Sequence, residues 1–162
     1  METLERLIVD IGRLDDGNHE HLEGLLDQAV LELNDLEQLL PAGPIAYVLN
    51  VNLLPDDALL VRGTLSLRCD CVCSRCGGDF AATFEELAYC ETFNVAGKES
   101  LDLTESVRES IILALPSYPI CKEDCKGVCL RCGQDLNVGS CRCESMGVES
   151  PWDALNDLGP KA

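Results

Sequence analysis

Alternating apolar and polar positions dominate the middle of the chain and predict β-strands. Residues Ile45–Leu54 place an apolar side chain at nearly every second position, as a strand with one buried face does. The alternation resumes over Leu59–Cys69 and again over Phe80–Phe93, and a short apolar run at Leu7–Ile11 predicts a further strand. Consecutive strands with no helix between them predict an antiparallel meander rather than βαβ units.

Two stretches carry the three-and-four spacing of an amphipathic helix. The first is Leu22–Leu40, which a run of proline and glycine follows, and a strand within Ala29–Leu33 is the alternative. The second helix opens with Asp102 and Glu105, which have the spacing of a capping box: Asp102 would cap the helix and Glu105 would lie in its first turn. The helix ends before Pro116. Its apolar stripe is wide, so we expect this helix to be mostly buried.

The composition sets the nature of the core and the partners that the chain suits. With 162 residues and a hydrophobic fraction of 46%, the sequence fits one domain, or one domain with a small metal module. Only 4% of the residues are aromatic, so the core should be aliphatic. Acidic residues outnumber basic ones 29 to 12, for a net charge of -17. This charge disfavours general binding to nucleic acid and suits a basic partner protein.

The N-terminus and the hydropathy give an expectation for the compartment. The first residues lack both a basic start and an apolar run, so we expect no secretion signal. No stretch approaches the roughly 20 apolar residues that span a bilayer. We therefore expect a cytoplasmic protein without membrane contact. In such a reducing compartment, clustered cysteines are more often metal ligands than disulfides.

Six of the eleven cysteines fall between Cys121 and Cys143, with the spacing C-x3-C-x3-C-x2-C-x8-C-x-C. Short loops that return pairs of thiolates to one point suit a tetrahedral Zn²⁺ site. Disulfides and packed free thiols are the alternatives. A separate pair, Cys73 and Cys76, needs ligands from elsewhere, because two thiolates cannot close a structural site. A glycine follows each C-x2-C pair and lets the backbone turn with its N–H groups toward the sulfurs.

The remaining cysteines and the histidines favour structural interpretations. We interpret Cys69, Cys71 and Cys90 as small buried apolar side chains. His19 and His21 have a spacing that could hold a metal. Because nothing nearby supplies a third and a fourth ligand, we interpret them as solvated side chains of a polar loop.

A series of motifs follows in order after Val61. It comprises C-x-R-C at residues 73–76, Leu-Ala-Leu-Pro at 113–116, C-K-G-x-C at 125–129, C-G-x-x-L-N at 132–137 and a final C-x-C. The joint pattern resembles the bacterial YceD family of large ribosomal RNA subunit accumulation proteins, over about Val61 to Cys143. The resemblance implies a non-enzymatic factor needed for the accumulation of large-subunit (23S) ribosomal RNA.

The resemblance also implies how the ligands divide between zinc sites. Cys73 and Cys76 would join Cys121 and Cys125 in one site. A second, ribbon-like site would use the four remaining cysteines of the cluster, Cys129, Cys132, Cys141 and Cys143. The main alternative is a single site formed by Cys121, Cys125, Cys129 and Cys132.

The basic residues of the cluster are candidates for contact with ribosomal RNA or a ribosome-assembly intermediate. They are Lys122, Lys126, Arg131 and Arg142. They alternatively only offset the charge of the thiolates. A redox or rubredoxin-like iron module is the second functional interpretation, because iron shares tetrahedral sulfur geometry with zinc. We expect neither an enzyme nor a small-molecule substrate, since no Ser/His/Asp set and no Gly-rich phosphate loop occurs.

Together these patterns predict an α+β fold, in which an antiparallel sheet packs with one or two helices. We expect residues 1–118 to form this core domain and residues 119–143 to form a zinc-binding module docked on the Cys73/Cys76 pair. Residues 144–162 would be a linker and a short helix that begins at Pro151. Trp152 would dock that helix on the core, or alternatively anchor a partner.

Overall fold

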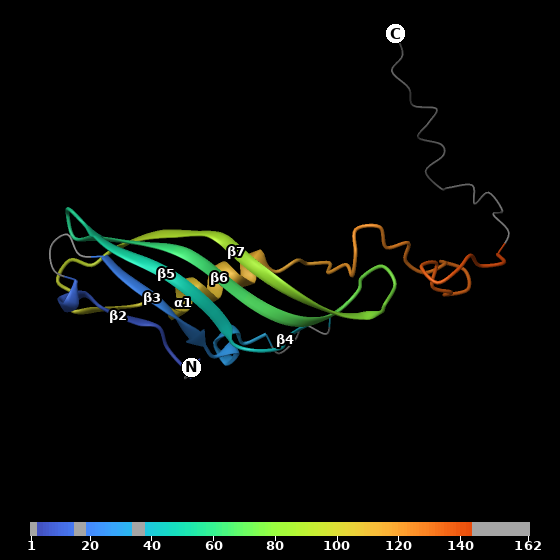
Figure 1. Ribbon diagram of the computed structural model, residues 1–162, viewed down its shortest axis with the longest axis horizontal. Helices are drawn as coiled ribbons and strands as arrows, with labels where there is room; N and C mark the ends of the chain where they lie inside the picture. Colours follow the sequence, from blue (N-terminus) through green and yellow to red (C-terminus); the bar gives the residue numbers. More distant parts are fainter. Residues whose placement is uncertain (1–2, 15–18, 34–37, 144–162) are drawn as a thin grey trace, which may run out of the picture.

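The computed structural model describes residues 3–14, 19–33 and 38–143, and the alternating stretches form the expected antiparallel meander. Strand β5 (Ile45–Leu54) pairs with β6 (Ala58–Val72), and β6 pairs with β7 (Asp79–Asn94). Figure 1 shows the three long strands running side by side through the molecule. The hairpin between β6 and β7 closes at residues 73–78, where the first cysteine pair lies.

Shorter elements complete one six-stranded sheet and a separate two-stranded ribbon. Strand β3 (His19–Leu26) pairs with β5, β1 (Thr3–Leu4) runs parallel to β3, and β4 (Leu39–Pro41) pairs with β6. The ribbon joins β2 (Ile8–Asp10) to β8 (Ser100–Asp102). Two 3-10 helices, η1 (Ile11–Arg13) and η2 (Gln28–Leu31), and one α-helix, α1 (Thr104–Ala114), are the helical elements of the described residues.

The helix predicted over Leu22–Leu40 is wrong for the residues that the structure describes, 22–33 and 38–40, and so is the alternative strand within Ala29–Leu33; residues 34–37 lie outside the described residues. Leu22 lies in β3, which pairs with β5 in continuous antiparallel register, and Ala29 lies in η2. The apolar spacing is helical, but pairing with the exposed edge of β5 outweighs that local preference. Glycine also suits position 24 of this strand, because the Tyr47 side chain of the neighbouring strand lies against it. A Cβ at Gly24 would lie 2.4 Å from the Tyr47 hydroxyl oxygen.

The second predicted helix is found, with two differences in detail. The Asp102 carboxylate accepts a hydrogen bond from the Thr104 backbone N–H at 2.9 Å. Glu105 does not complete the predicted capping box, because its carboxylate pairs with Arg108 at 3.0 Å. The helix is buried on one face only, since Leu113 is 85% exposed.

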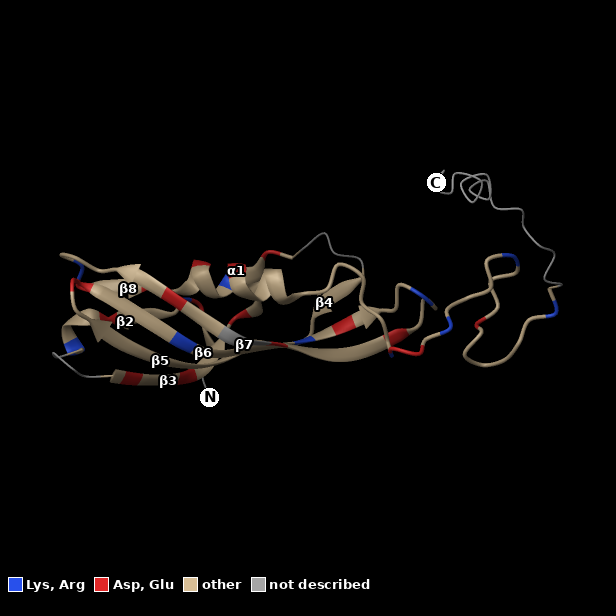
Figure 2. Ribbon diagram, turned by 90° about the horizontal axis from the view of Figure 1, so that it is seen from above, with Lys and Arg blue, Asp and Glu red and all other residues tan. Residues whose placement is uncertain are grey.

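The core is aliphatic, as predicted, and lies on one face of the large sheet. Helix α1 contacts β6, β7 and η2, and Figure 2 shows it covering that face. Val107 and Ile111 of α1 are buried against the sheet. Among the largest fully buried side chains are Leu26, Leu31, Ile45, Leu49, Leu59, Leu65, Leu67 and Leu103. The opposite face of the sheet carries exposed polar side chains, including Asn50, Arg62 and Arg68.

After α1 the chain leads to the far end of the sheet. In Figure 1 it passes the β6–β7 hairpin and continues beyond it as a series of loops. The last described segment, residues 119–143, holds one isolated β-bridge, between Val128 and Asp135. The predicted helix at Pro151, with Trp152, lies outside the described residues. No helix of the described part of the chain has the length and apolar character needed to cross a membrane.

Candidate metal centres

The β6–β7 hairpin presents Cys73 and Cys76 at the end of the sheet. Its turn is closed by two hydrogen bonds, from Cys73 N–H to the Gly78 carbonyl at 2.9 Å and from Gly77 N–H to the Cys73 carbonyl at 2.8 Å. Gly77 has a φ of +70°, which a residue with a side chain adopts only at a cost. The sharp turn predicted at the glycine after the C-x2-C pair is therefore confirmed here, although the Gly77 N–H itself bonds to a carbonyl oxygen and not to a sulfur.

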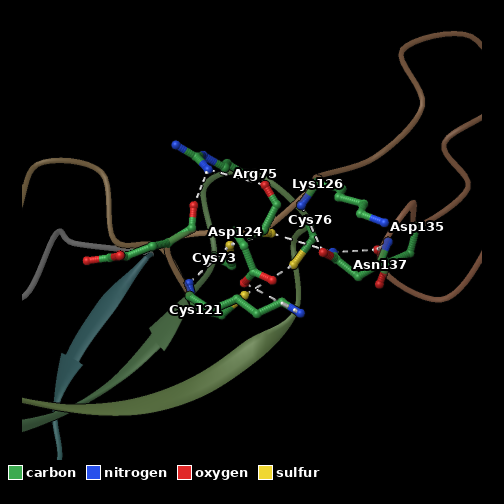
Figure 3. A network of polar contacts seen from close by, with 11 residues as sticks. Cys73, Arg75, Cys76, Cys121, Asp124, Lys126, Asp135 and Asn137 are labelled. Atoms are coloured by element: carbon green, nitrogen blue, oxygen red, sulfur yellow. Dashed lines mark hydrogen bonds and ion pairs between the residues drawn. The ribbon is translucent and has the colours of Figure 1, made fainter.

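The tail after α1 brings two more cysteines to this hairpin. The sulfur of Cys125 lies 3.9 Å from that of Cys73, and the sulfur of Cys121 lies 3.9 Å from that of Cys76. All four sulfurs lie within 4.8 Å of one another. Figure 3 shows Cys73 and Cys76 of the hairpin facing Cys121 of the tail. Residues separated by about 50 positions in the sequence thus form one four-thiol group.

The geometry of this first group fits a single tetrahedral ion. Four sulfurs at about 2.3 Å from one ion lie about 3.8 Å from each other, close to both distances above. Cys73 and Cys125 are buried, and Cys76 and Cys121 are partly buried. A closed set of four thiols suits a structural Zn²⁺ or an iron ion, and the spacing is the same for both.

Backbone N–H groups favour the thiolate form of one ligand in the first group. Burial opposes the ionisation of Cys73, but backbone hydrogen bonds from Cys121, Cys76 and Arg75 outweigh it and lower its pKa to about 6. One of these donors, Cys121 N–H, lies 3.4 Å from the Cys73 sulfur. Burial and the neighbouring sulfurs raise the pKa of Cys121 to about 12. The group therefore holds the Cys73 thiolate readily, whereas Cys121 gives up its proton only when a cation compensates the charge.

Arg75 fastens the tail to the hairpin from within the C-x2-C pair. Its guanidinium donates to the Glu123 carbonyl at 3.0 Å and to the Cys125 carbonyl at 3.2 Å. Its own carbonyl accepts from Val128 N–H at 3.2 Å. Gly127 permits this approach, because a Cβ there would lie 2.9 Å from the Arg75 carbonyl oxygen. Sequence reasoning missed this role, although the arginine is part of the C-x-R-C motif.

A second four-thiol group lies further along the tail. The sulfurs of Cys129, Cys132, Cys141 and Cys143 lie within 4.8 Å of one another. Its C-x2-C turn repeats the first, with a Gly133 N–H to Cys129 carbonyl bond of 2.8 Å and a φ of +73° at Gly133. This group is less buried than the first, and Cys132 is exposed. The two groups have the same members as the two-site prediction, and the single-site alternative does not correspond to either of them.

The second group also contains one thiol that ionises readily, Cys129, and one that does not, Cys143. Backbone N–H groups of Arg131 and Cys132 lower the pKa of Cys129 to about 6. Hydrogen bonding with Cys132 and burial raise the pKa of Cys143 to about 12. The second group, like the first, is prepared to exchange its remaining protons for a cation.

The other candidate ligands lie away from both groups. Cys69 and Cys71 are buried in the core beside β7, as predicted, and burial raises the pKa of both thiols. Cys90 is exposed, so its interpretation as a buried side chain is wrong; it faces solvent opposite Arg62. His19 and His21 lie in β3 rather than in a loop.

The predicted contact residues all lie exposed around the two groups. They are Lys122, Lys126, Arg131 and Arg142. Lys122 has its ammonium nitrogen 3.8 Å from an Asp124 carboxylate oxygen. Lys126 lines a surface pocket of about 650 Å³ together with residues 136–140. Figure 2 shows basic residues recurring along this segment, whereas acidic residues recur on the sheet and on α1.

Comparison with known proteins finds a matching family model and several relatives. The family described as "Large ribosomal RNA subunit accumulation protein YceD" matches residues 91–159. A protein of Zea mays named "Large ribosomal RNA subunit accumulation protein YCED homolog 1, chloroplastic" is 38% identical over 58 residues, which are 35% of this chain and 20% of that protein. Its namesake in Arabidopsis thaliana is 36% identical over 60 residues, 37% of this chain and 19% of that protein.

One further relative extends the similarity. An uncharacterized protein of Mycobacterium leprae is 30% identical over 110 residues, which cover 59% of this chain and 50% of that protein. The chain thus spans about a fifth of the length of the two chloroplast relatives and half that of the mycobacterial one. No solved structure matches. The family match contains all six tail cysteines and begins after Cys73 and Cys76. The resemblance to the YceD family that the motifs predicted is therefore confirmed, and residues 91–159 carry it.

Proposed function

We propose that this chain is a non-catalytic factor for the accumulation of large-subunit ribosomal RNA, and that its two four-thiol groups hold structural Zn²⁺. The observation that carries the metal assignment is the convergence of eight cysteines into two groups whose sulfurs lie within 4.8 Å of one another. The names of the family and of the two chloroplast relatives support the assignment to ribosomal RNA. All eleven cysteines are free thiols, which suits a reducing compartment such as the cytoplasm.

Zinc in the first group would stabilise the attachment of the tail to the sheet. The group joins Cys76 of the hairpin to Cys121 of the tail, 45 positions later. Free energy gained when four thiolates bind the ion becomes folding free energy of this attachment. The residues themselves supply the thiolates, the N–H donors that stabilise Cys73, and the glycine turns that aim the sulfurs inward.

The two groups together would present the basic residues of the tail to RNA or to a ribosome-assembly intermediate. Between Pro119 and Cys143 the four basic residues exceed three acidic ones, in a chain whose net charge is -17. Because each filled site carries a charge of about -2, contact with phosphate would depend on the individual basic side chains and not on a net positive charge of this end. A basic partner protein could bind the acidic surfaces at the same time.

The functional test is complementation of a bacterial strain that lacks its own member of this family. We expect the wild-type chain to restore the ratio of large-subunit to small-subunit ribosomal RNA, and the double variant K126E/R142E to restore it poorly. K98E is the matched control, because Lys98 is an exposed lysine in the turn after β7, outside the tail. Full rescue by K126E/R142E would overturn the proposed contact surface, and failure of the wild-type chain would overturn the function.

The iron alternative is tested separately by metal analysis of protein expressed without added metal. Two Zn²⁺ per chain would support the structural assignment. An iron-loaded, coloured protein would favour the rubredoxin-like alternative, because tetrahedral sulfur ligands serve both metals. The variants C73S/C76S and C141S/C143S should each lose one ion, which assigns the ions to the two groups.

A further inference from the structure

Asn137 belongs to the loop of one four-thiol group but contacts the other group. It lies in the eight-residue segment between Cys132 and Cys141, both members of the second group. Its side-chain nitrogen Nδ2 lies 3.5 Å from the sulfur of Cys125, a member of the first group. Figure 3 shows the Asn137 side chain reaching across from its loop toward the first group.

Every polar atom of the Asn137 side chain has a partner that fixes its orientation. The oxygen Oδ1 accepts from Lys126 N–H at 2.8 Å, so the nitrogen must face the sulfur. The nitrogen has two hydrogens, and its second partner is an Asp135 carboxylate oxygen at 2.7 Å. The same oxygen accepts from Asn137 N–H at 2.8 Å. The amide is therefore held as a donor to Cys125.

The backbone of this loop is fastened to the segment between the two groups. Leu136 N–H donates to the Gly127 carbonyl at 2.9 Å, and Val128 forms a β-bridge with Asp135. On its other side the loop ends at Cys141, so the position of its far end depends on how the second group is held together. The loop that carries Asn137 is thus supported on one side by Gly127 and Val128, which lie between the two groups, and on the other side by Cys141 of the second group.

We propose that Asn137 is a positioning residue that stabilises the Cys125 thiolate of the first metal site and couples that site to the second. Four thiolates and one dication carry a net charge of about -2, and an N–H donor to sulfur stabilises this negative charge. A filled second site holds the loop in place and keeps Asn137 aimed at Cys125, so it raises the metal affinity of the first site. By reciprocity, a filled first site raises the affinity of the second. The inference rests on the proposed metal binding.

Three variants of the full chain separate the hydrogen bond from general loop packing. N137A removes both the donor to sulfur and the acceptor for Lys126 N–H. N137D keeps the acceptor but places a carboxylate oxygen against the thiolates. Q134A is the matched control, because Gln134 lies in the same loop and its side chain donates to the Ser140 carbonyl at 3.4 Å rather than to a sulfur.

Metal affinity of each site is measured by Co²⁺ titration against a competing chelator, with alkylation and mass spectrometry to identify the protected cysteines. We expect N137A to weaken the first site about 10-fold, N137D to weaken it more, and Q134A to change it less than about twofold. Far-UV circular dichroism checks the sheet. N137D supplies the test if N137A does not fold, since it retains the bond to Lys126 N–H.

The coupling is measured in a double-mutant cycle with C141S/C143S, which removes the second site. In the wild-type background this change should weaken the first site, and in the N137A background it should weaken the first site little further. Equal first-site metal affinities in N137A and Q134A would overturn the role of Asn137. If the losses of first-site affinity caused by N137A and by C141S/C143S simply add in the combined variant, the coupling would be overturned. A wild-type chain that binds neither Co²⁺ nor Zn²⁺ would instead overturn the proposed metal function, and this inference with it.

Discussion

The guanidinium of Arg75 lies 3.2 Å from the carbonyl oxygen of Cys125, so a residue inside one cysteine pair holds the backbone of another pair. A second bond to the Glu123 carbonyl, at 3.0 Å, makes the contact two-pronged. The tail thus depends on the hairpin through side chain–backbone contacts as well as through any shared metal ion.

Replacing Arg75 should loosen the tail without unfolding the sheet. R75A removes both charge-assisted hydrogen bonds, and we expect a loss of about 1–2 kcal/mol in the free energy of unfolding of the metal-loaded protein. Urea denaturation measures the loss. R68A is the control, because Arg68 is an exposed arginine on the open face of β6. An equal effect of the two variants would show that the Arg75 contacts contribute nothing specific.

Gly127 should tolerate no side chain, for two physical reasons that can be separated. Its φ of +71° is a left-handed conformation, and a Cβ would lie 2.9 Å from the Arg75 carbonyl oxygen. G97A supplies the comparison, because Gly97 has a φ of +68° and nothing within 4 Å of an added Cβ. We expect G97A to cost about 1 kcal/mol through backbone strain alone and G127A to cost more.

Thermal unfolding of the metal-loaded protein measures both glycine variants. The excess destabilisation of G127A over G97A reports the close approach of tail and hairpin. If the two variants lose the same stability, the separation between Gly127 and Arg75 in solution must be larger than in the structure.

The sequence predicted the sheet and the membership of the cysteine groups better than the N-terminal third. Ile45–Leu54 places an apolar side chain at nearly every second position, so its strand was predicted with its observed bounds. In Leu22–Leu40 the local spacing is helical, and the strand that forms instead depends on a partner, β5, about 26 positions later along the chain. Long-range pairing of this kind leaves no mark in a single periodic stretch.

The contacts around the cysteines were not predictable for a related reason. The spacing of the thiols indicated metal ligands, but it left one site or two open, and the division into two groups came from the resemblance to the YceD family. The roles of Arg75 and Asn137 depend on which loop lies beside which, and only the folded chain brings Asn137 next to Cys125. Cys90 shows a different limit of prediction. Its place in a strand was predicted correctly, but it lies on the exposed face of that strand and not on the buried face.

In the metal-free second group, Cys129 should react at neutral pH and Cys143 should not. The pKa of Cys129 is about 6 and that of Cys143 about 12, against an ordinary value of 9.0. Since the thiolate is the nucleophile, iodoacetamide should modify Cys129 with a midpoint near pH 6 and leave Cys143 largely unmodified up to pH 9. Peptide mass spectrometry measures the rates. Equal rates for the two cysteines would contradict the hydrogen-bonding arrangement, and bound metal should protect both.

The same pKa shift fixes how stability of the metal-free protein depends on pH. The folded pKa of Cys129 lies below its unfolded value, so its contribution is fully present above pH 9 and is lost as the pH falls through about 6. Cys143 has the opposite sign: its contribution is present below pH 9 and is lost as the pH rises through about 12. Between pH 6 and 9 the wild-type protein should therefore gain stability from Cys129, and C129S should lose that gain.

Removal of metal should release the tail and leave the sheet folded. Residues 119–143 contain one isolated β-bridge, so little besides the sulfur groups and the Arg75 and Asn137 contacts fixes their conformation. The aliphatic core, by contrast, includes neither four-thiol group. Amide hydrogen exchange after chelation should therefore increase across the tail, while Leu49 in β5 and Val61 in β6 stay protected. The variant C73S/C76S should show increased exchange around Cys121 and Cys125 without chelation. Loss of protection in β5 after chelation would show instead that the metal sites stabilise the sheet itself.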